Sequence, residues 1–267
     1  MKMKNCIEHT WVICAYKESA YLEECVTSLK KQKMSSKIIM VTSTPNSYIQ
    51  KLAEKYSIPL YVNECESGIT QDWNFGLSKI DTKYATIAHQ DDVYYDTYLE
   101  TLMNKMNQYK RPLIAFSEYT ELRGDKRVYH TTMLKIKRKM LLPLRVKLFQ
   151  NSRFVRRRIL SLGDPICCPA VTFCLDYVKR PIFSHGFRSC EDWEAWEKIS
   201  KLKGSFVYVP KPLMSHRIHE ESATTAIIQD NARAEENYIM FCKFWPKCIA
   251  KVINKFYNKS EKSNELS

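Results

Sequence analysis

The sequence has no apolar run long enough to cross a membrane, and its cysteines form no closely spaced pair. Near the N-terminus only six apolar residues, 11–16, stand together, which is too few for the apolar core of a signal peptide. The ten cysteines are scattered through 267 residues with no Cys-x-x-Cys spacing, so a disulfide framework is not expected. We therefore expect the protein to remain in the reducing cytoplasm.

Acidic residues are missing from one long stretch. Between Asp125 and Asp164 there are twelve Lys or Arg residues and no Asp or Glu, whereas the other thirty basic residues nearly balance the 29 acidic ones. The net charge of +13 is therefore local, which indicates a surface feature with a function. We define residues 126–160 as the basic segment and interpret it as an amphipathic insertion in a domain of residues 1–225. Residues 226–267 are interpreted as a basic, helical C-terminal region.

Two partners could attract these cations. Nucleic acid is the first, but the sequence has no recognised nucleic-acid motif, and the cations of the basic segment alternate with Leu, Met, Val and Phe. An anionic membrane surface fits this mixture better. A helix predicted from Pro246 to Tyr257 adds to this interpretation, because apolar residues share one face and lysines recur every fourth residue (Ile249, Val252, Ile253 and Phe256; Lys247, Lys251, Lys255 and Lys259). The alternative is a helix that packs on the domain with a solvated basic face.

Short apolar runs alternate with longer amphipathic stretches over the first 120 residues, and no internal repeat or low-complexity linker interrupts them. This alternation predicts the α/β class, with a largely parallel sheet in one main domain. We expect strands at residues 10–16, 38–41, 60–62, 84–88, 113–116, 167–175 and 205–209. Helices are expected from about 22, at 48–56, at 70–80 and at 191–202.

The sequence His89-Gln90-Asp91-Asp92 directly follows the predicted strand 84–88. Ligands of open α/β sheets bind beyond the carboxyl ends of the strands, so chemistry is expected here. Two adjacent carboxylates raise each other's pKa, and a bound Mg²⁺ or Mn²⁺ that also contacts a diphosphate removes that cost. The alternative is that Asp91 and Asp92 cap a helix starting near Tyr94.

Three segments together, residues 10–32, 70–80 and 87–100, resemble family 2 glycosyltransferases of the GT-A fold, and the resemblance extends from residue 10 to 225. It implies a Rossmann-like nucleotide-binding sheet flanked by helices, a nucleotide-sugar donor and Mn²⁺ or Mg²⁺. The family motif is Asp-x-Asp or Asp-x-Asp-Asp, and here His89 replaces the first Asp. By resemblance Asp91, Asp92 and His219 hold the metal.

The same resemblance assigns the donor contacts. They come from the loops after the first, second and fourth strands, from the helix behind the diphosphate and from the closing Arg-x-His motif: Ala15, Tyr16, Glu18, Thr42, Ser43, Asn74, His89, Gln90, Asp91 and Arg217. At the second strand end, family members carry an Asp that reads uracil, whereas this chain has Thr42-Ser43. Among donors, the resemblance favours a UDP-sugar.

Glu191-Asp192 precedes a Trp-containing helix and follows a glycine-containing loop, as the acidic pair of the family does. By resemblance Asp192 is the general base and Glu191 its catalytic neighbour, since an acceptor hydroxyl must lose its proton as it attacks the anomeric carbon. The structural alternative is a pair of carboxylates that the helix dipole stabilises. Residues 163–171 resemble a stretch that, in bacterial members with the His-Gln-Asp-Asp variant, precedes a strand lining the acceptor side.

We thus expect an inverting transfer of a sugar from a nucleotide-sugar to a glycan on a lipid carrier, at the cytoplasmic face of the cell membrane. Inversion comes from the family alone. Two alternatives remain at this stage: a nucleotidyltransferase with a similar metal site, and a basic protein that only binds membrane or nucleic acid.

Overall fold

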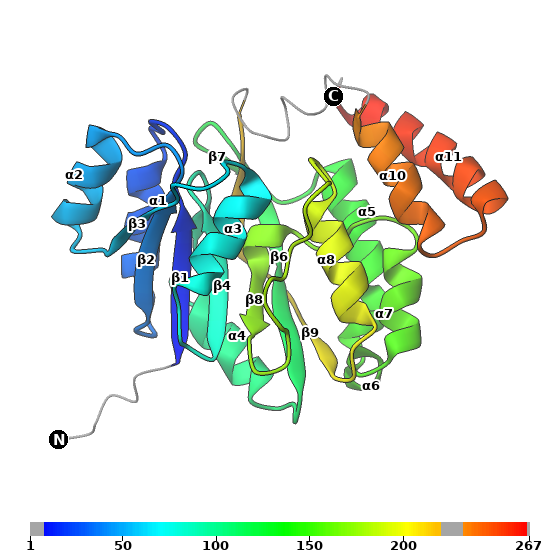
Figure 1. Ribbon diagram of the computed structural model, residues 1–267. Coiled ribbons are helices and arrows are strands. Elements are labelled where there is room, and N and C mark those ends of the chain that lie inside the picture. Colours follow the sequence, from blue (N-terminus) through cyan, green and yellow to red (C-terminus); the bar gives the residue numbers. More distant parts are fainter. Residues whose placement is uncertain (1–7, 220–231, 266–267) are drawn as a thin grey trace.

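The computed structural model describes residues 8–219 and 232–265. Within these residues nine strands form one sheet in the order β3-β2-β1-β4-β8-β6-β9-β5, with β7 paired to β6 (Figure 1). The N-terminal half is parallel, because helices connect its strands: β1 His9–Cys14, α1 Leu22–Lys30, β2 Lys37–Thr42, α2 Ser47–Lys55, β3 Leu60–Val62, α3 Ile69–Ser78 and β4 Tyr84–His89. The predicted α/β class and GT-A-like sheet are confirmed.

The second half of the sheet is mixed. β8 (Val171–Cys174) runs antiparallel between β4 and the long strand β6 (Pro112–Arg123), and β9 (Ser205–Ile218) runs parallel to β6. The remaining elements are β5 Val93–Tyr94, α4 Tyr98–Met106, β7 Lys126–Val128, α5 Thr132–Leu141, a 3-10 turn at Leu142–Arg145, α6 Lys147–Gln150, α7 Arg153–Leu160, a 3-10 turn at Cys168–Ala170, α8 Glu191–Ser200, α10 Ala232–Cys242 and α11 Lys247–Glu265.

Successive side chains of a strand point to opposite faces of the sheet, so β1 supplies both halves of the core. Trp11 and Ile13 pack with α1, α2 and α4 on one face, and Val12 packs with α3 on the other. All three are fully buried. Burial of this strand on both faces explains its continuous apolar sequence.

Several predicted boundaries were wrong. Tyr94 does not start a helix, because β5 pairs it with Met214 of β9, and α4 begins only at Tyr98. The Asp91-Asp92 pair therefore caps no helix. β6 and β9 are also longer than predicted, since polar residues in their second halves are buried with partners: Glu118 accepts a hydrogen bond from Tyr208 (2.6 Å) and pairs with Arg138 (3.0 Å).

The basic segment is not only a surface feature, contrary to the sequence interpretation. It folds into α5, α6 and α7, which lie beside α8 in Figure 1. Arg157 of α7 pairs with the buried Glu197 of α8 at 2.7 Å. Arg156 is 1% exposed and donates to the carbonyls of Ser200 (2.9 Å), Gly204 (2.5 Å) and Leu202 at the end of α8. Part of the basic charge therefore holds the domain together.

We expect Arg156→Met to lower the free energy of unfolding by about 3 kcal/mol, because the buried carbonyls at the end of α8 lose a charged donor. Arg153→Met on the exposed side of the same helix should change it by no more than about 0.5 kcal/mol. Urea denaturation of both variants measures the difference. Equal stabilities would show that the buried guanidinium contributes nothing.

The C-terminal helix α11 packs on the domain and also leaves an apolar stripe uncovered. Ala250 is fully buried, and Ile253 and Tyr257 contact the core. Ile249, Val252 and Phe256 are exposed, the last by 70%. Among the described residues, no helix is both long enough and apolar enough to span a bilayer. The predicted domain boundary at residue 225 lies outside the described residues.

Candidate active site

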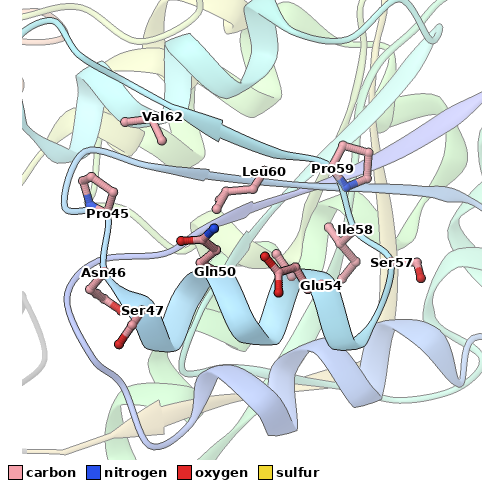
Figure 2. A pocket seen from close by; sticks show the side chains of 11 residues that line it. Pro45, Asn46, Ser47, Gln50, Glu54, Ser57, Ile58, Pro59, Leu60 and Val62 are labelled. Atoms are coloured by element: carbon pink, nitrogen blue, oxygen red, sulfur yellow. The ribbon is translucent and has the colours of Figure 1, made fainter.

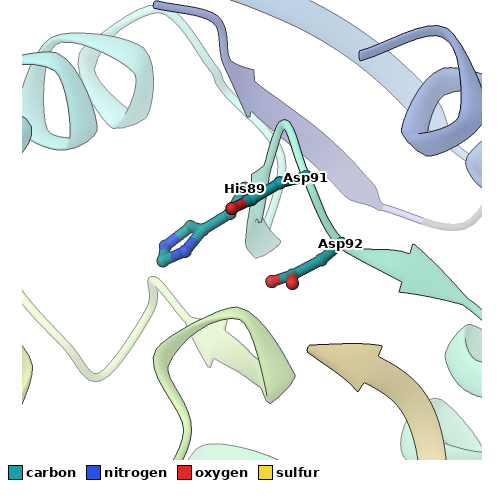
Figure 3. Close-up of side chains that lie close together, drawn as sticks. All are labelled: His89, Asp91 and Asp92. Atoms are coloured by element: carbon teal, nitrogen blue, oxygen red, sulfur yellow. The ribbon is translucent and has the colours of Figure 1, made fainter. Parts of the chain in front are cut away.

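Parallel pairing brings the carboxyl ends of β1, β2 and β4 to one edge of the sheet, and an acidic cluster stands there. Ligand atoms of His89, Asp91 and Asp92 all lie within 4.8 Å of one another (Figure 3). His89 Nε2 and Asp92 Oδ2 are buried and find no hydrogen-bond partner in the described part of the chain. An imidazole nitrogen and carboxylate oxygens suit Mn²⁺, and the carboxylates suit Mg²⁺, so these residues fit a divalent cation.

His89 is held in the form that such a cation needs. Its ring stacks on that of Trp73 at a centroid distance of 5.2 Å. Burial lowers the pKa of His89, against the opposing charges of Asp92 and Asp91, so the imidazole is neutral at pH 7. A neutral imidazole keeps a lone pair for a metal or a hydroxyl donor.

Asp92 is fully buried, and β9 supplies its partners. Its Oδ1 lies 2.9 Å from Nδ1 of His216 and accepts a hydrogen bond from the backbone N–H of Arg217 at 3.0 Å. Burial by itself would lower the pKa of His216, but the charge and hydrogen bond of Asp92 raise it to about 9. His216 is therefore a cation at neutral pH that offsets one of the two carboxylates.

Asp91 is paired with the other imidazole of the closing motif. Its Oδ2 lies 3.0 Å from Nε2 of His219. Burial raises the pKa of Asp91, but the charge of His216, that of His89 once acid protonates it, and the hydrogen bond from His219 outweigh burial and leave the pKa below its ordinary value. The sequence placed His219 among the metal ligands; the structure brings it to Asp91 but makes His89 the third member of the close cluster.

The guanidinium of Arg217, expected at the leaving phosphates, is occupied within the protein. It pairs with Glu24 of α1, donates from Nε to the carbonyl of Asp91 at 2.9 Å and lies 4.2 Å above the ring of Tyr21. Arg217 is 5% exposed, so it reaches a diphosphate only if its bond to Glu24 opens. In the structure it fixes the loop that carries the two carboxylates.

The loop after β1 carries Tyr16 and Glu18, both exposed at the rim of the sheet edge, while Ala15 is buried. Both ends of the Gln90 amide are hydrogen-bonded to the backbone of Tyr16. Its Oε1 accepts from the Tyr16 N–H at 2.9 Å, and its Nε2 donates to the Tyr16 carbonyl at 3.1 Å. Gln90 thus ties the first strand-end loop to the fourth. From the sequence, Gln90 was expected to contact the nucleotide-sugar. In the structure its amide holds the loop after β1 in place.

A carboxylate that was not assigned from the sequence contacts the loop after β2. Asp72 of α3 is buried, accepts from Ser43 Oγ at 2.7 Å and from Asn63 Nδ2 at 2.8 Å. The side chain of Thr42 is also buried and accepts from the N–H of Thr44. A carboxylate therefore does lie at the second strand end, although it comes from α3, the helix after β3.

The amide of Asn74 is bonded within the protein and is not directed at a nucleotide-sugar. Its Nδ2 donates to the Phe183 carbonyl at 2.8 Å, and its Oδ1 accepts from the N–H groups of Ile182 and Phe183, both at 3.2 Å. The expected diphosphate contact is therefore replaced by a bond between α3 and the loop leading to α8.

Asp192 and Glu191 begin α8, as the sequence predicted. Asp192 Oδ1 accepts a hydrogen bond from the N–H of Trp193 at 2.8 Å. Burial raises the pKa of Glu191 to about 7 and also raises that of Asp192. The charge of Asp192 acts on His89, so the acidic pair lies near enough to the strand-end cluster to interact with it. A carboxylate with a raised pKa suits a general base.

One further residue of the site, His216, was not assigned from the sequence. A signal for it existed, because in a strand it alternates with the buried Ser215 and Arg217.

A separate surface hollow of about 830 Å³ lies between α2 and β3 (Figure 2). Its eleven lining residues come from 45–62 and include neither the strand-end cluster nor the acidic pair. Glu54 is the only titratable acid among them, so the hollow lacks the groups that hold a metal or activate a hydroxyl.

Comparison with solved structures establishes the class. The fold is shared with a mannosyltransferase from Pyrobaculum calidifontis solved with GDP-Man and Mn²⁺ (TM-score 0.66, 12% identity, 97% of this chain and 74% of that one). It is also shared with residues 1–349 of S. aureus TarS solved with UDP-GlcNAc (TM-score 0.64, 16% identity, 92% and 70%). The fold is thus that of the GT-A glycosyltransferases.

Comparison of sequences gives the family. Residues 10–174 match the model described as glycosyl transferase family 2, and the chain belongs to that family. A relative described as an uncharacterized glycosyltransferase of Haemophilus influenzae is 22% identical over 232 residues, which are 81% of this chain and 67% of that protein. The protein is therefore a glycosyltransferase, and neither the nucleotidyltransferase nor the non-enzymatic alternative stands.

Proposed function

We propose that this glycosyltransferase transfers a sugar from a nucleotide-sugar to a hydroxyl of a lipid-linked glycan, with inversion at the anomeric carbon. The observation that carries the proposal is a cluster suited to a cation at the end of β4 together with a carboxylate of raised pKa at the start of α8, whose charge acts on His89. The first fits a diphosphate and the second fits a nucleophile that must lose a proton.

Each group has one role in this reaction. Asp192 accepts the proton of the acceptor hydroxyl while the hydroxyl oxygen forms a bond to the anomeric carbon. The bond from that carbon to the phosphate oxygen breaks, and the nucleoside diphosphate leaves with the electron pair. His216, protonated at neutral pH, supplies positive charge beside Asp92. Tyr16, exposed at the rim, offers a ring on which a base stacks.

His89, Asp91 and Asp92 are the residues that would hold Mn²⁺ or Mg²⁺. When bound, the cation supplies positive charge that the diphosphate oxygens need, in the donor and in the leaving group. The solved mannosyltransferase with Mn²⁺ supports this assignment by its shared fold.

Donor binding tests the first half of the proposal. We expect a UDP-sugar to raise Tm by several degrees in the presence of Mn²⁺ and by much less in EDTA, because the diphosphate needs the cation. GDP- and dTDP-sugars form the rest of the panel, and GDP-mannose is included because the solved mannosyltransferase holds it. The absence of a metal-dependent shift with every nucleotide-sugar would refute the donor assignment.

A peripheral position at the inner face of the cell membrane is part of the proposal. The uncovered stripe of α11 has Val252 and Phe256, 56% and 70% exposed, beside the exposed Lys251 and Lys255. Apolar side chains flanked by lysines suit the headgroup region of an anionic bilayer. A lipid-linked acceptor would meet the enzyme there.

Vesicle sedimentation tests this position. We expect binding to vesicles with anionic lipid and not to purely zwitterionic ones, and Val252→Ser with Phe256→Ser should weaken it about tenfold, since each loses exposed apolar area. Substitutions are preferable to deletion of α11, because Ala250 and Tyr257 belong to the core. The matched control is Val62→Ser, an exposed residue of β3, and Figure 1 shows β3 on the opposite side of the molecule from α11. If the α11 variant and the Val62→Ser control lost vesicle binding equally, α11 would not be part of the membrane interface.

A further inference from the structure

A carboxylate from the C-terminal region binds the loop that leads into α8. Glu236 of α10 is 8% exposed and lies against the three residues that precede α8. Its Oε1 accepts a hydrogen bond from the N–H of Arg188 at 2.8 Å. Its Oε2 accepts from the N–H groups of Ser189 at 2.9 Å and Cys190 at 3.1 Å, and from Ser189 Oγ at 2.7 Å. One buried carboxylate therefore binds three successive backbone N–H groups.

The negative charge of Glu236 suits this position. Successive N–H groups can form a concave site for an anion, and the positive end of a helix dipole lies at the helix N-terminus. A buried carboxylate is costly unless it is hydrogen-bonded, and here it has four donors. All four belong to the loop, so these bonds fix the loop relative to α10.

The last residue of this loop, Cys190, is the N-cap of α8. Its carbonyl accepts the first hydrogen bond of the helix, from the N–H of Glu194 at 2.9 Å. Asp192, the proposed base, follows two residues later in the same turn, and its Oδ1 accepts from the N–H of Trp193. The helical backbone sets the direction in which the Asp192 side chain leaves it. A shift of Cys190 would therefore move Asp192 as well.

The helix α10 is itself held by both of its neighbours. Lys243, directly after α10, pairs with Glu194 of α8 at 3.0 Å. Asn237 of α10 accepts from Cys190 Sγ at 3.4 Å and donates to Asn258 of α11 at 3.0 Å. The carboxylate that binds the loop is thus presented from a helix that α8 and α11 hold in place.

The core holds the remainder of α8. Trp193 and Trp196 are buried, and Trp193 Nε1 donates to the carbonyl of Leu160 at 3.0 Å. Loss of the Glu236 carboxylate should therefore loosen the first turn and leave the body of the helix in place. The residues that would hold the metal lie on a different element, at the end of β4, so donor binding should persist.

We propose that Glu236 is a positioning residue for the base: by binding the N–H groups of residues 188–190, it fixes the first turn of α8 and with it the direction of Asp192. This inference rests on the proposed role of Asp192. It assigns the C-terminal region a part in catalysis that is separate from any membrane contact.

Kinetics of Glu236→Ala separate positioning from a structural role. Because a displacement of about 1 Å can cost about 10²-fold in rate, kcat should fall about 10- to 100-fold, while the donor Kd with Mn²⁺ stays within about threefold. Release of nucleoside diphosphate from the donor that gives the largest Tm shift with Mn²⁺ is the readout for kcat, and calorimetry gives Kd. Glu235→Ala, on the exposed side of the same helix, is the control and should change neither value.

Two milder variants act on the same bonds. Glu236→Gln keeps an oxygen that can take the place of Oε2, so its kcat should stay within about fivefold of the wild-type value. Ser189→Ala removes only the hydroxyl bond. It should lower kcat about threefold in the wild-type background and have no effect in Glu236→Ala, because the two residues act through one contact.

The outcomes separate the two claims. An Asp192→Asn variant that keeps full activity would refute the proposed base. If that variant is inactive but Glu236→Ala turns over as fast as Glu235→Ala, the positioning role is wrong and the base stands. A donor Kd that weakens in Glu236→Ala as much as kcat falls would also overturn the positioning role. Should Glu236→Ala fail to fold, a wild-type kcat in Ser189→Ala would overturn it.

Discussion

Replacing Asp192 with Asn should lower kcat for sugar transfer about 10³-fold and leave the donor Kd within about threefold. Asn cannot accept the hydroxyl proton, and general bases contribute roughly 10²- to 10⁴-fold. Donor binding should persist because the strand-end cluster is intact. The hydrogen bond from the Trp193 N–H also persists, since the Asn oxygen can accept it in place of Asp192 Oδ1. Steady-state kinetics and calorimetric donor titration give the two numbers.

Asp96→Asn is the matched control for this substitution. Asp96 lies before α4, is about half exposed and pairs with Lys33 at 3.3 Å, away from the acidic pair. It should show wild-type kinetics. An Asp192→Asn variant that is as active as this control would mean that another group takes the proton.

The second large effect is expected at Asp92. Asp92→Asn should weaken Mn²⁺ binding, and with it donor binding, by about 10²-fold, because the side chain loses its negative charge and an amide NH₂ group, which cannot bind a cation, replaces the unpartnered oxygen. The Asn oxygen still accepts from Arg217 N–H, so the loop should keep its conformation. Mn²⁺ titration followed by electron paramagnetic resonance measures the affinity.

The same variant should change the titration of His216 without any metal present. Its pKa of about 9 depends on Asp92, so it should fall to 6.5 or below in Asp92→Asn. The sign follows from the raised pKa: below pH 6.5 the wild-type pair adds stability, which is lost as pH rises through about 9. Imidazole chemical shifts followed against pH show both states. Asp81→Asn, which removes the carboxylate of the exposed ion pair with Lys37, should leave the pKa of His216 unchanged.

The first half of the fold could be predicted because its strands are buried on both faces and its helices have one apolar side. Residues 84–88 read as a strand from sequence alone, and the position of His89 to Asp92 at its end followed. The second half was predicted less well. Polar residues such as Glu118 and Thr120 lie inside strands, and the period-two pattern fails where buried polar groups pair with distant partners.

The residues of the candidate site that follow a strand end or belong to a sequence motif could be predicted. The two carboxylates and the acidic pair of α8 came from local patterns. The structural role of Arg156 did not, because twelve clustered cations look alike in sequence and only the fold distinguishes the buried Arg156 from the exposed ones. Arg217 and Asn74 show the reverse case: motif position suggested ligand contacts, but their neighbours in the fold occupy their donors.

A crystal structure with Mn²⁺ and a nucleotide-sugar tests the central claim most directly, since the anomalous signal of manganese locates the ion directly. The ion should lie beside Asp92 Oδ2 and His89 Nε2, in contact with the diphosphate, with the anomeric carbon facing Asp192. A manganese ion or diphosphate bound elsewhere, for example in the hollow between α2 and β3, with no metal at Asp91 and Asp92, would contradict the account.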